Sequence, residues 1–310
     1  MAYKPELLVT ASGMEELQRL MEAGADAFVI GEARYGSRLA GEFTLDMIRE
    51  AASILHARDK RIYVAINNLI DNKTLETLPQ YMEGLHEAKV DGIVFGDPAV
   101  LMAAKAHAPG IALHWNAEMT STNYATAEYW ARRGASRFVV AREINMEQIE
   151  EMKAKSKLAL QVQVHGMTNI YHSKRTLVNS YLDHKGQEQG GREVDRERGL
   201  YLMEAERPDE RYPIYEDANG THIMSSDDIC MLENLHELLV ICVDSLKIEG
   251  ILKSIEYNEV VVKAYRQAID AYLADPEGYE FQEEWLDAIR DVQDPKRELT
   301  YGFFYKEQVY

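Results

Sequence analysis

The chain has 310 residues, of which 46% are hydrophobic, and it carries a formal net charge of −18. This apolar content supports a sizeable core and excludes wholesale disorder, whereas the acidic balance argues against nucleic-acid binding by this chain alone, because phosphate contacts need clustered Lys and Arg. Two cysteines exclude a disulfide scaffold, and no apolar run approaches the roughly 20 residues that span a bilayer. We therefore expect a cytoplasmic protein without a signal peptide or a membrane span.

Short apolar stretches alternate with helical patterns along the chain. Helices are expected to begin at Thr44 and Asn145 as N-caps, and Pro98 suits the first turn of another. No glycine-rich phosphate loop follows the first strand, although such a loop is typical of a doubly wound sheet. Eight strands separated by helices predict a (β/α)8 TIM-like barrel. The expected strands are 6–10, 27–30, 61–66, 92–95, 111–115, 137–141, 158–164 and 244–248.

Polar residues follow most of these strands. In a barrel the carboxyl ends of all strands meet at one mouth, where barrel enzymes keep their chemistry. Each ending alone could be a turn residue with satisfied hydrogen bonds, but together they favour a functional site. They are Asn67, Asp97, Asn116, Glu118, Arg142, Glu143, His165, Lys247 and Glu249.

The segment from residue 160 to 181 is the richest in reactive side chains. It begins as a strand with alternating Gln and Val, turns after His165, and continues into His172, Ser173 and Arg175. Imidazoles transfer protons near neutral pH, and guanidinium groups bind carboxylates by bidentate geometry. The alternative interpretation is a polar strand followed by a solvated loop.

We expect one anion-accepting pocket at the ends of the last three strands. The residues expected to line it are His165, Arg175, Lys247 and Glu249, with Arg142 from the sixth strand. Lys247 and Glu249 share one side of the eighth strand because side chains alternate with period 2, and His165 would lie beside them. Burying several cations with one carboxylate is costly unless an anion compensates. The alternative is a structural ion-pair network of Lys247, Glu249 and Arg142. The candidate catalytic residues are His165, His172 and Glu249, and the candidate binding residues are Arg142, Ser173, Arg175, Lys247, Asn116 and Glu118.

One connection is far longer than the usual βα loop: about sixty residues separate the seventh strand from a helix expected at 227–240. Within it, 201–203 and 212–224 are predicted strands, and the second turns at Asn219-Gly220, a strong hairpin signal. We predict a lid-like, β-containing insertion, 166–226, over the mouth.

The end of the chain is expected to lie outside the barrel. Residues 254–274 form a long amphipathic helix that completes a barrel domain of residues 1–275, and an acidic, aromatic extension, 276–310, packs on it. Both cysteines, Cys230 and Cys242, fall in an apolar segment predicted to be helical, so we expect buried thiols rather than ligands.

Several segments together resemble the peptidase U32 family across nearly the whole chain. They are AGADAFVIGEARYGSR, AREINMEQI, VHGM, YPIYEDANGTHIMSSDDICML, VDSLKIEG and RELTYGF. In the family pattern, cysteines follow the His-Gly turn, roughly HGAMC and then SGRC, with another pair further along, and the resemblance implies that they hold an iron–sulfur cluster. Here Asn169 and Thr176 occupy the first two of these positions, and no cysteine occurs from 182 to 229. The sequence therefore predicts neither a cofactor nor a metal on this chain.

The cysteine-poor pattern resembles a short branch of the family that occurs beside a longer, cluster-bearing paralogue. The resemblance implies that the pair acts in a prephenate-dependent 5-hydroxylation of the tRNA wobble uridine. It also implies that tRNA is bound through the complex of the two proteins. Two alternatives remain, a peptidase and a non-catalytic partner that stabilises the paralogue. A peptidase needs an activated nucleophile or a metal-bound water, and the chain has no G-x-S-x-G elbow, no H-E-x-x-H and no evident base beside Ser173.

Overall fold

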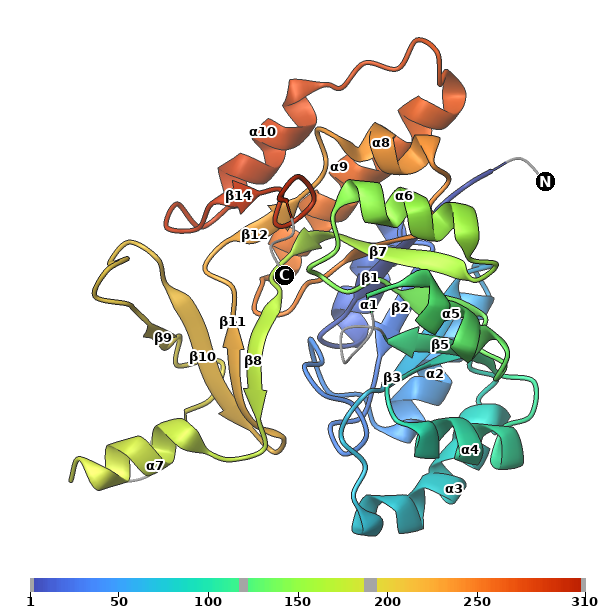
Figure 1. Ribbon diagram of the computed structural model, residues 1–310, viewed down its shortest axis with the longest axis vertical. Helices are drawn as coiled ribbons and strands as arrows, with labels where there is room; N and C mark the ends of the chain where they lie inside the picture. Colours follow the sequence, from blue (N-terminus) through green and yellow to red (C-terminus); the bar gives the residue numbers. More distant parts are fainter. Residues whose placement is uncertain (1–2, 117–121, 187–193, 308–310) are drawn as a thin grey trace.

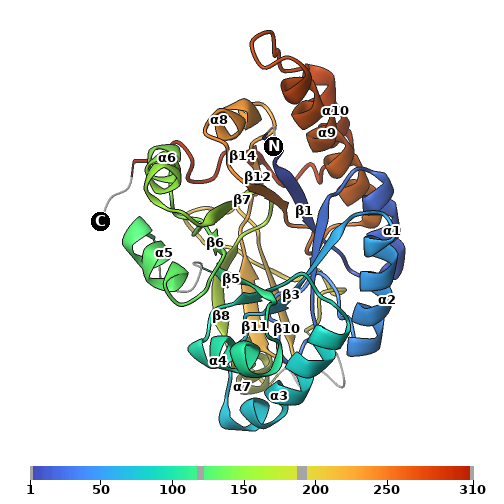
Figure 2. The same cartoon turned by 90° about the vertical axis from the view of Figure 1, so that its right-hand side faces the viewer.

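The computed structural model describes residues 3–116, 122–186 and 194–307. Eight parallel strands form a closed barrel, because β13 pairs with both β1 and β7 while each of the others pairs with the next along the chain. The predicted (β/α)8 barrel is therefore confirmed (Figure 2). The strands are β1 (Glu6–Thr10), β2 (Ala27–Ile30), β3 (Arg61–Ile66), β4 (Gly92–Phe95), β5 (Ala112–Asn116), β6 (Arg137–Val139), β7 (Ala159–Gly166) and β13 (Ser245–Ile248).

Helices surround the barrel, and their apolar faces form the main core against the outward side chains of the strands. Several begin at side-chain caps: Thr44, Asp71 and Asn145 each accept a hydrogen bond from a backbone N–H of the first turn. The helices are α1 (Met14–Glu22), α2 (Leu45–His56), α3 (Asn72–Glu87), α4 (Pro98–His107), α5 (Tyr124–Ala131), α6 (Met146–Lys155), α8 (Leu235–Val240) and α9 (Ile255–Ala274). Among the described residues, none of the helices combines the length and apolar content that crossing a membrane requires.

The inside of the barrel is filled in layers, as is usual for this fold. Near the amino ends of the strands, Glu6 accepts hydrogen bonds from Arg137 Nη1 and from the Tyr63 hydroxyl, both at 2.6 Å. An apolar layer that includes Leu8 and Val94 lies next to this network. The carboxyl ends of the strands are consequently the part of the interior where a cavity can form.

The connection from β7 to α8 forms a separate antiparallel sheet in the order β8-β11-β10-β9. Figure 2, which looks along the barrel, shows this sheet across one end. The hairpin turn fixes its tip, since Asn219 Nδ2 donates to the carbonyls of Ala33 and Gly36 at 3.0 and 3.2 Å. The predicted β-containing insertion and the Asn219-Gly220 turn are confirmed. The elements are β8 (Asn169–Ser173), α7 (Leu177–His184), β9 (Tyr201–Leu202), β10 (Tyr212–Asp217) and β11 (Gly220–Met224).

The segment after the insertion differs from the sequence-based expectation. The helix expected from residue 227 begins only at Leu235, because β12 (Asp228–Cys230) continues the barrel sheet antiparallel to β7. Cys230 is therefore buried in a strand, and Cys242 lies beyond α8 and is exposed. The prediction of a buried thiol is confirmed for Cys230, although it lies in a strand and not in a helix, and it is wrong for Cys242.

The C-terminal extension is joined to the barrel by both a helix and a strand. Helix α10 (Glu283–Val292) packs on α9, and β14 (Leu299–Thr300) pairs with β12 (Figure 1). The extension thus adds to the barrel sheet as well as covering it. The domain boundary at residue 275 stays a prediction.

Candidate functional site

The mouth of the barrel contains a cavity of about 70 Å³. Side chains that point into the barrel form its floor, the loop after β2 forms one wall, and the insertion contributes Met167, Asn169 and Met224. The lining is rich in amides. Its polar residues are Thr10, Ser37, Arg38, Asn67, Asn116, Gln161, Gln163, Asn169, Lys247 and Glu249.

An ion pair fixes the charged wall of this cavity. Lys247 Nζ lies 2.8 Å from Glu249 Oε2, and the two side chains are 15% and 10% exposed. The other carboxylate oxygen of Glu249 accepts hydrogen bonds from Thr10 Oγ1 and from the backbone N–H of Ile251, both at 3.1 Å. The carboxylate therefore has one orientation, and it holds the Lys247 ammonium at the cavity.

Two polar atoms in the lining lack hydrogen-bond partners among the described residues. They are Asn169 Oδ1 and Ser37 Oγ, and both are buried. Because buried polar atoms in folded proteins are nearly always hydrogen-bonded, a bound ligand or water with a suitable donor fits here. Asn169 also occupies one of the positions at which the family pattern has a cysteine.

Arg38 supplies a second cation to the cavity. Its φ of 56° places it in the left-handed region, which non-glycine residues rarely adopt and which is concentrated at functional sites. The sequence interpretation missed Arg38 as a site residue, although it ends the segment AGADAFVIGEARYGSR.

His165 does not reach the cavity. Gln163 of β7 is paired with Lys247 of β13, but the next pairing joins His165 to Ile248, so that one residue of β7 is left over as a bulge. The bulge reverses the alternation of side chains and turns the His165 ring outward. The prediction that His165 lines the mouth is therefore wrong.

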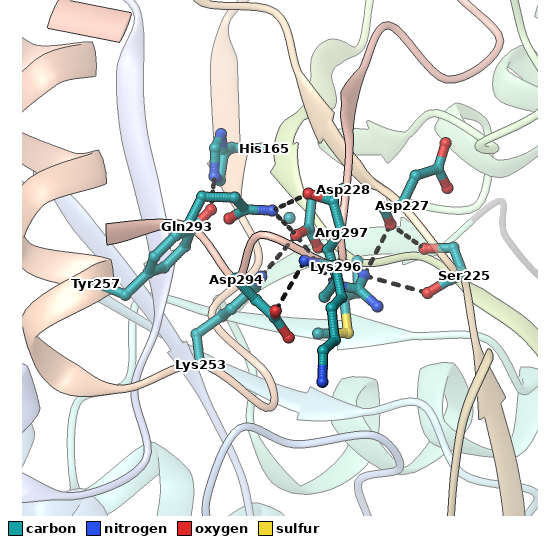
Figure 3. A network of polar contacts seen from close by, with 12 residues as sticks. His165, Ser225, Asp227, Asp228, Lys253, Tyr257, Gln293, Asp294, Lys296 and Arg297 are labelled. Atoms are coloured by element: carbon teal, nitrogen blue, oxygen red, sulfur yellow. Dashed lines mark hydrogen bonds and ion pairs between the residues drawn. The ribbon is translucent and has the colours of Figure 1, made fainter. Parts of the chain in front are cut away.

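The environment of His165 also disfavours a proton-transfer role. The ring is fully buried against α9, where its Nε2 lies 2.8 Å from the Tyr257 hydroxyl (Figure 3). Burial lowers the pKa of His165 to about 3, so the ring stays neutral near pH 7.

The other candidates from the same segment lie on the insertion. His172 Nε2 is 2.9 Å from the Asn219 carbonyl, its ring stacks on His222, and burial lowers its pKa. Ser173 Oγ accepts a hydrogen bond from the Arg175 backbone N–H at 3.2 Å, and Arg175 is exposed. None of the three candidates is among the described residues that line the mouth cavity.

The ion-pair network considered as an alternative forms only in part. Arg142 Nε donates to Glu143 Oε1 at 2.9 Å, whereas Lys247 pairs with Glu249. Glu118 lies outside the described residues. Of the predicted site residues, the structure brings Asn116, Lys247 and Glu249 together in the cavity.

A second polar cluster joins β12 to the C-terminal extension (Figure 3). Asp228, which is fully buried, accepts hydrogen bonds from Lys253 Nζ at 2.6 Å, Gln293 Nε2 at 2.8 Å and Arg297 Nη2 at 2.9 Å. Burial alone would raise the pKa of Asp228, but Lys253 and Arg297 lower it well below its usual range. This network was not anticipated from the sequence, since its members are far apart along the chain.

Fold and site define a (β/α)8-barrel protein with a polar mouth to which a separate antiparallel sheet contributes. Residues 12–309 match the model of peptidase family U32. The chain belongs to this family.

The relatives include two proteins of one organism. tRNA hydroxylation protein P2 of Bacillus subtilis (strain 168) is 46% identical over 308 residues, which cover 99% of each chain. tRNA hydroxylation protein P1 of the same organism is 31% identical over 99% of this chain and 74% of its own length, so it is the longer protein. Among solved structures, the U32 peptidase Mk0906 matches with a TM-score of 0.52 at 15% identity, over 80% of this chain and 94% of that chain, a likeness that concerns the fold alone.

Proposed function

We propose that this chain is a component of tRNA hydroxylation that acts, together with a longer paralogue, on position 5 of the wobble uridine. The observation that carries the proposal is the end-to-end match with tRNA hydroxylation protein P2, at 46% identity over 99% of both chains. The relative named P1 is longer, which supports a division of labour between two related proteins.

The mouth of the barrel is the proposed site of a small organic anion such as prephenate, one carboxylate of which would enter the cavity of about 70 Å³. Lys247 and Arg38 offer two cations against the Glu249 carboxylate, and a guanidinium can hold a carboxylate by two parallel hydrogen bonds. Amide side chains, among them Asn67 and Asn116, add donors and acceptors for hydroxyl and keto oxygens. A dicarboxylate with a hydroxyl and a ketone, as prephenate is, matches this combination.

We also propose that no iron–sulfur cluster is held by this chain. An Asn amide and a Thr hydroxyl replace thiolates at positions 169 and 176, and neither is a ligand of such clusters. The two cysteines do not substitute for them, because Cys230 is buried in β12 and Cys242 is exposed beyond α8. Any redox step would then belong to the cluster-bearing partner.

The geometry gives the peptidase alternative little support. His172, the imidazole next to Ser173 in sequence, is hydrogen-bonded to a backbone carbonyl, and Ser173 Oγ accepts a backbone N–H. In the part of the chain that the structure describes, no group of three or more His, Cys, Asp or Glu side chains could hold a metal ion. The third interpretation is a non-catalytic protein that stabilises the longer paralogue. It assumes the same partner as our proposal, but in it the mouth cavity has no part in the reaction.

Mass spectrometry of tRNA nucleosides tests the proposal. Strains that lack the gene for this chain, the gene for the longer paralogue, or both are compared with the parent strain. We expect the amounts of 5-hydroxyuridine and of nucleosides derived from it to fall in each single deletion and to reach zero in the double deletion. An unchanged nucleoside profile in the double deletion would contradict the proposed function.

A further inference from the structure

A larger groove, of about 500 Å³, lies beside the mouth cavity between the insertion and the C-terminal extension. Two carboxylates line it, those of Glu197 and Asp294. They are outnumbered by five cationic side chains, although the whole chain has a net charge of −18. The lining therefore has more cations than carboxylates, and one of the cations, Arg196, is paired with Asp217 at 3.5 Å. The cations are Arg196, Arg211, Lys253, Lys296 and Arg297.

The buried network described above positions two of these cations. Lys253 and Arg297 have side chains that are 7% and 8% exposed, and both bind the single carboxylate of Asp228. Asp228 thus holds both cations at the floor of the groove, where the Asp294 carboxylate also interacts with Lys253. Lys296 is exposed at its edge, and Figure 3 shows its side chain extending away from Asp228.

Aromatic rings accompany the cations on the opposite wall. Tyr201 is 44% exposed, and the Arg211 guanidinium lies 4.9 Å from the centre of its ring. Deeper in the same wall, the Arg196 guanidinium lies 4.7 Å from the ring of the buried Tyr215. Aromatic and guanidinium planes beside a row of cations are the means by which proteins bind single-stranded nucleic acid, with bases stacked and phosphates paired.

The groove also adjoins the mouth cavity. Ala40 and Met167 line both, so the two spaces share a wall. A strand whose backbone lies in the groove can therefore present one of its bases to the mouth. A folded protein partner would not need this combination of charge, stacking and continuity with the cavity.

We propose that this groove binds the backbone of single-stranded RNA next to the base that is presented to the mouth. The inference rests on the proposed function, since that function supplies a single-stranded substrate in the anticodon loop. It adds the surface of this chain that contacts the RNA, and it assigns phosphate pairing to Arg211 and Lys296 and base stacking to Tyr201.

Binding of a fluorescently labelled oligouridylate to the full-length chain tests this assignment, measured over a series of salt concentrations. The double variant Arg211→Ala/Lys296→Ala should bind more weakly, and the slope of log K against log salt should fall by about 0.7 for each phosphate that no longer has a cationic partner. Arg58→Ala/Lys105→Ala removes the same charge from exposed positions outside the groove, and should bind as wild type does. Tyr201→Ala should weaken binding about tenfold, whereas Tyr201→Phe, which keeps the ring, should not.

Two results would overturn the groove assignment. One is an oligouridylate that does not bind the wild-type chain, and the other is equal affinity and equal salt dependence in the groove and control double variants. Either would leave a protein segment as the better occupant of the groove. The proposed function itself is decided separately, by the nucleoside profile of the deletion strains, so that the two can fail independently.

Discussion

Replacing His165 should make the stability of the fold less dependent on pH between 7 and 5. Burial lowers the pKa of the folded imidazole to about 3, whereas the unfolded value is about 6.5. Because the folded pKa is the lower one, the imidazole is protonated in the unfolded chain but not in the folded chain over most of the range from about pH 6.5 to about pH 3. Its contribution to stability is therefore fully present above about pH 6.5 and is lost as the pH falls toward about 3. At pH 5 the loss amounts to about 2 kcal/mol relative to pH 7.

Denaturant unfolding at pH 7 and pH 5 measures this effect in the wild-type chain, His165→Phe and His165→Gln. Each substitution alters the hydrogen bond to Tyr257 and so changes stability at both pH values. The wild-type chain should lose about 2 kcal/mol more than either variant between the two pH values, since both variants lack the titrating ring. If all three chains lost the same stability, the ring would be protonated in the folded state, and the outward, buried position of His165 would be refuted.

Three further outcomes are expected. Asp228→Asn should lower the free energy of unfolding at pH 7 by about 3–5 kcal/mol, because two buried cations lose their counter-ion; a change below about 1 kcal/mol in chemical denaturation would contradict this. Gly166→Ala should prevent normal folding, since the φ of Gly166 is +97° and an added Cβ would lie 2.1 Å from the Glu249 carbonyl oxygen. Gly110→Ala is the control, because Gly110 has a φ of +87° but open space around it, and it should cost only about 1 kcal/mol in thermal unfolding. Similar losses for both variants would argue against the tight turn at Gly166. The chain purified without air should contain no stoichiometric iron by elemental analysis, and a charge-transfer absorbance with matching iron would mean that ligands other than cysteine pairs exist.

The barrel could be predicted because its signals are local. Each strand is a short apolar run with its own turn residues, and the hairpin at Asn219-Gly220 is set by two adjacent residues. The proximity of Lys247 and Glu249 could also be predicted, because the side chains of one strand alternate with a fixed period. The meeting of strand ends at the mouth then brought Asn116 into the same cavity.

The errors arose where distant segments decide the structure. The bulge that turns His165 outward depends on the pairing between β7 and β13, and the sequence of β7 alone does not predict it. Strand β12 is three residues long and exists because β7 and β14 offer edges to pair with. The role of Arg38 depends on a backbone conformation that a helix- or strand-based pattern does not predict.

Substitution of Lys247 shows whether the mouth cavity takes part in RNA hydroxylation. A strain lacking this chain is complemented with the wild-type gene, with Lys247→Met, or with Lys105→Met, which removes an exposed cation outside the cavity. tRNA nucleosides are quantified by mass spectrometry, and protein abundance and thermal unfolding are measured in parallel. We predict that Lys247→Met accumulates as folded protein but fails to restore 5-hydroxyuridine, while Lys105→Met restores it. Full restoration by Lys247→Met would contradict a role of the mouth cavity in hydroxylation, and would assign the Lys247–Glu249 pair to stability alone.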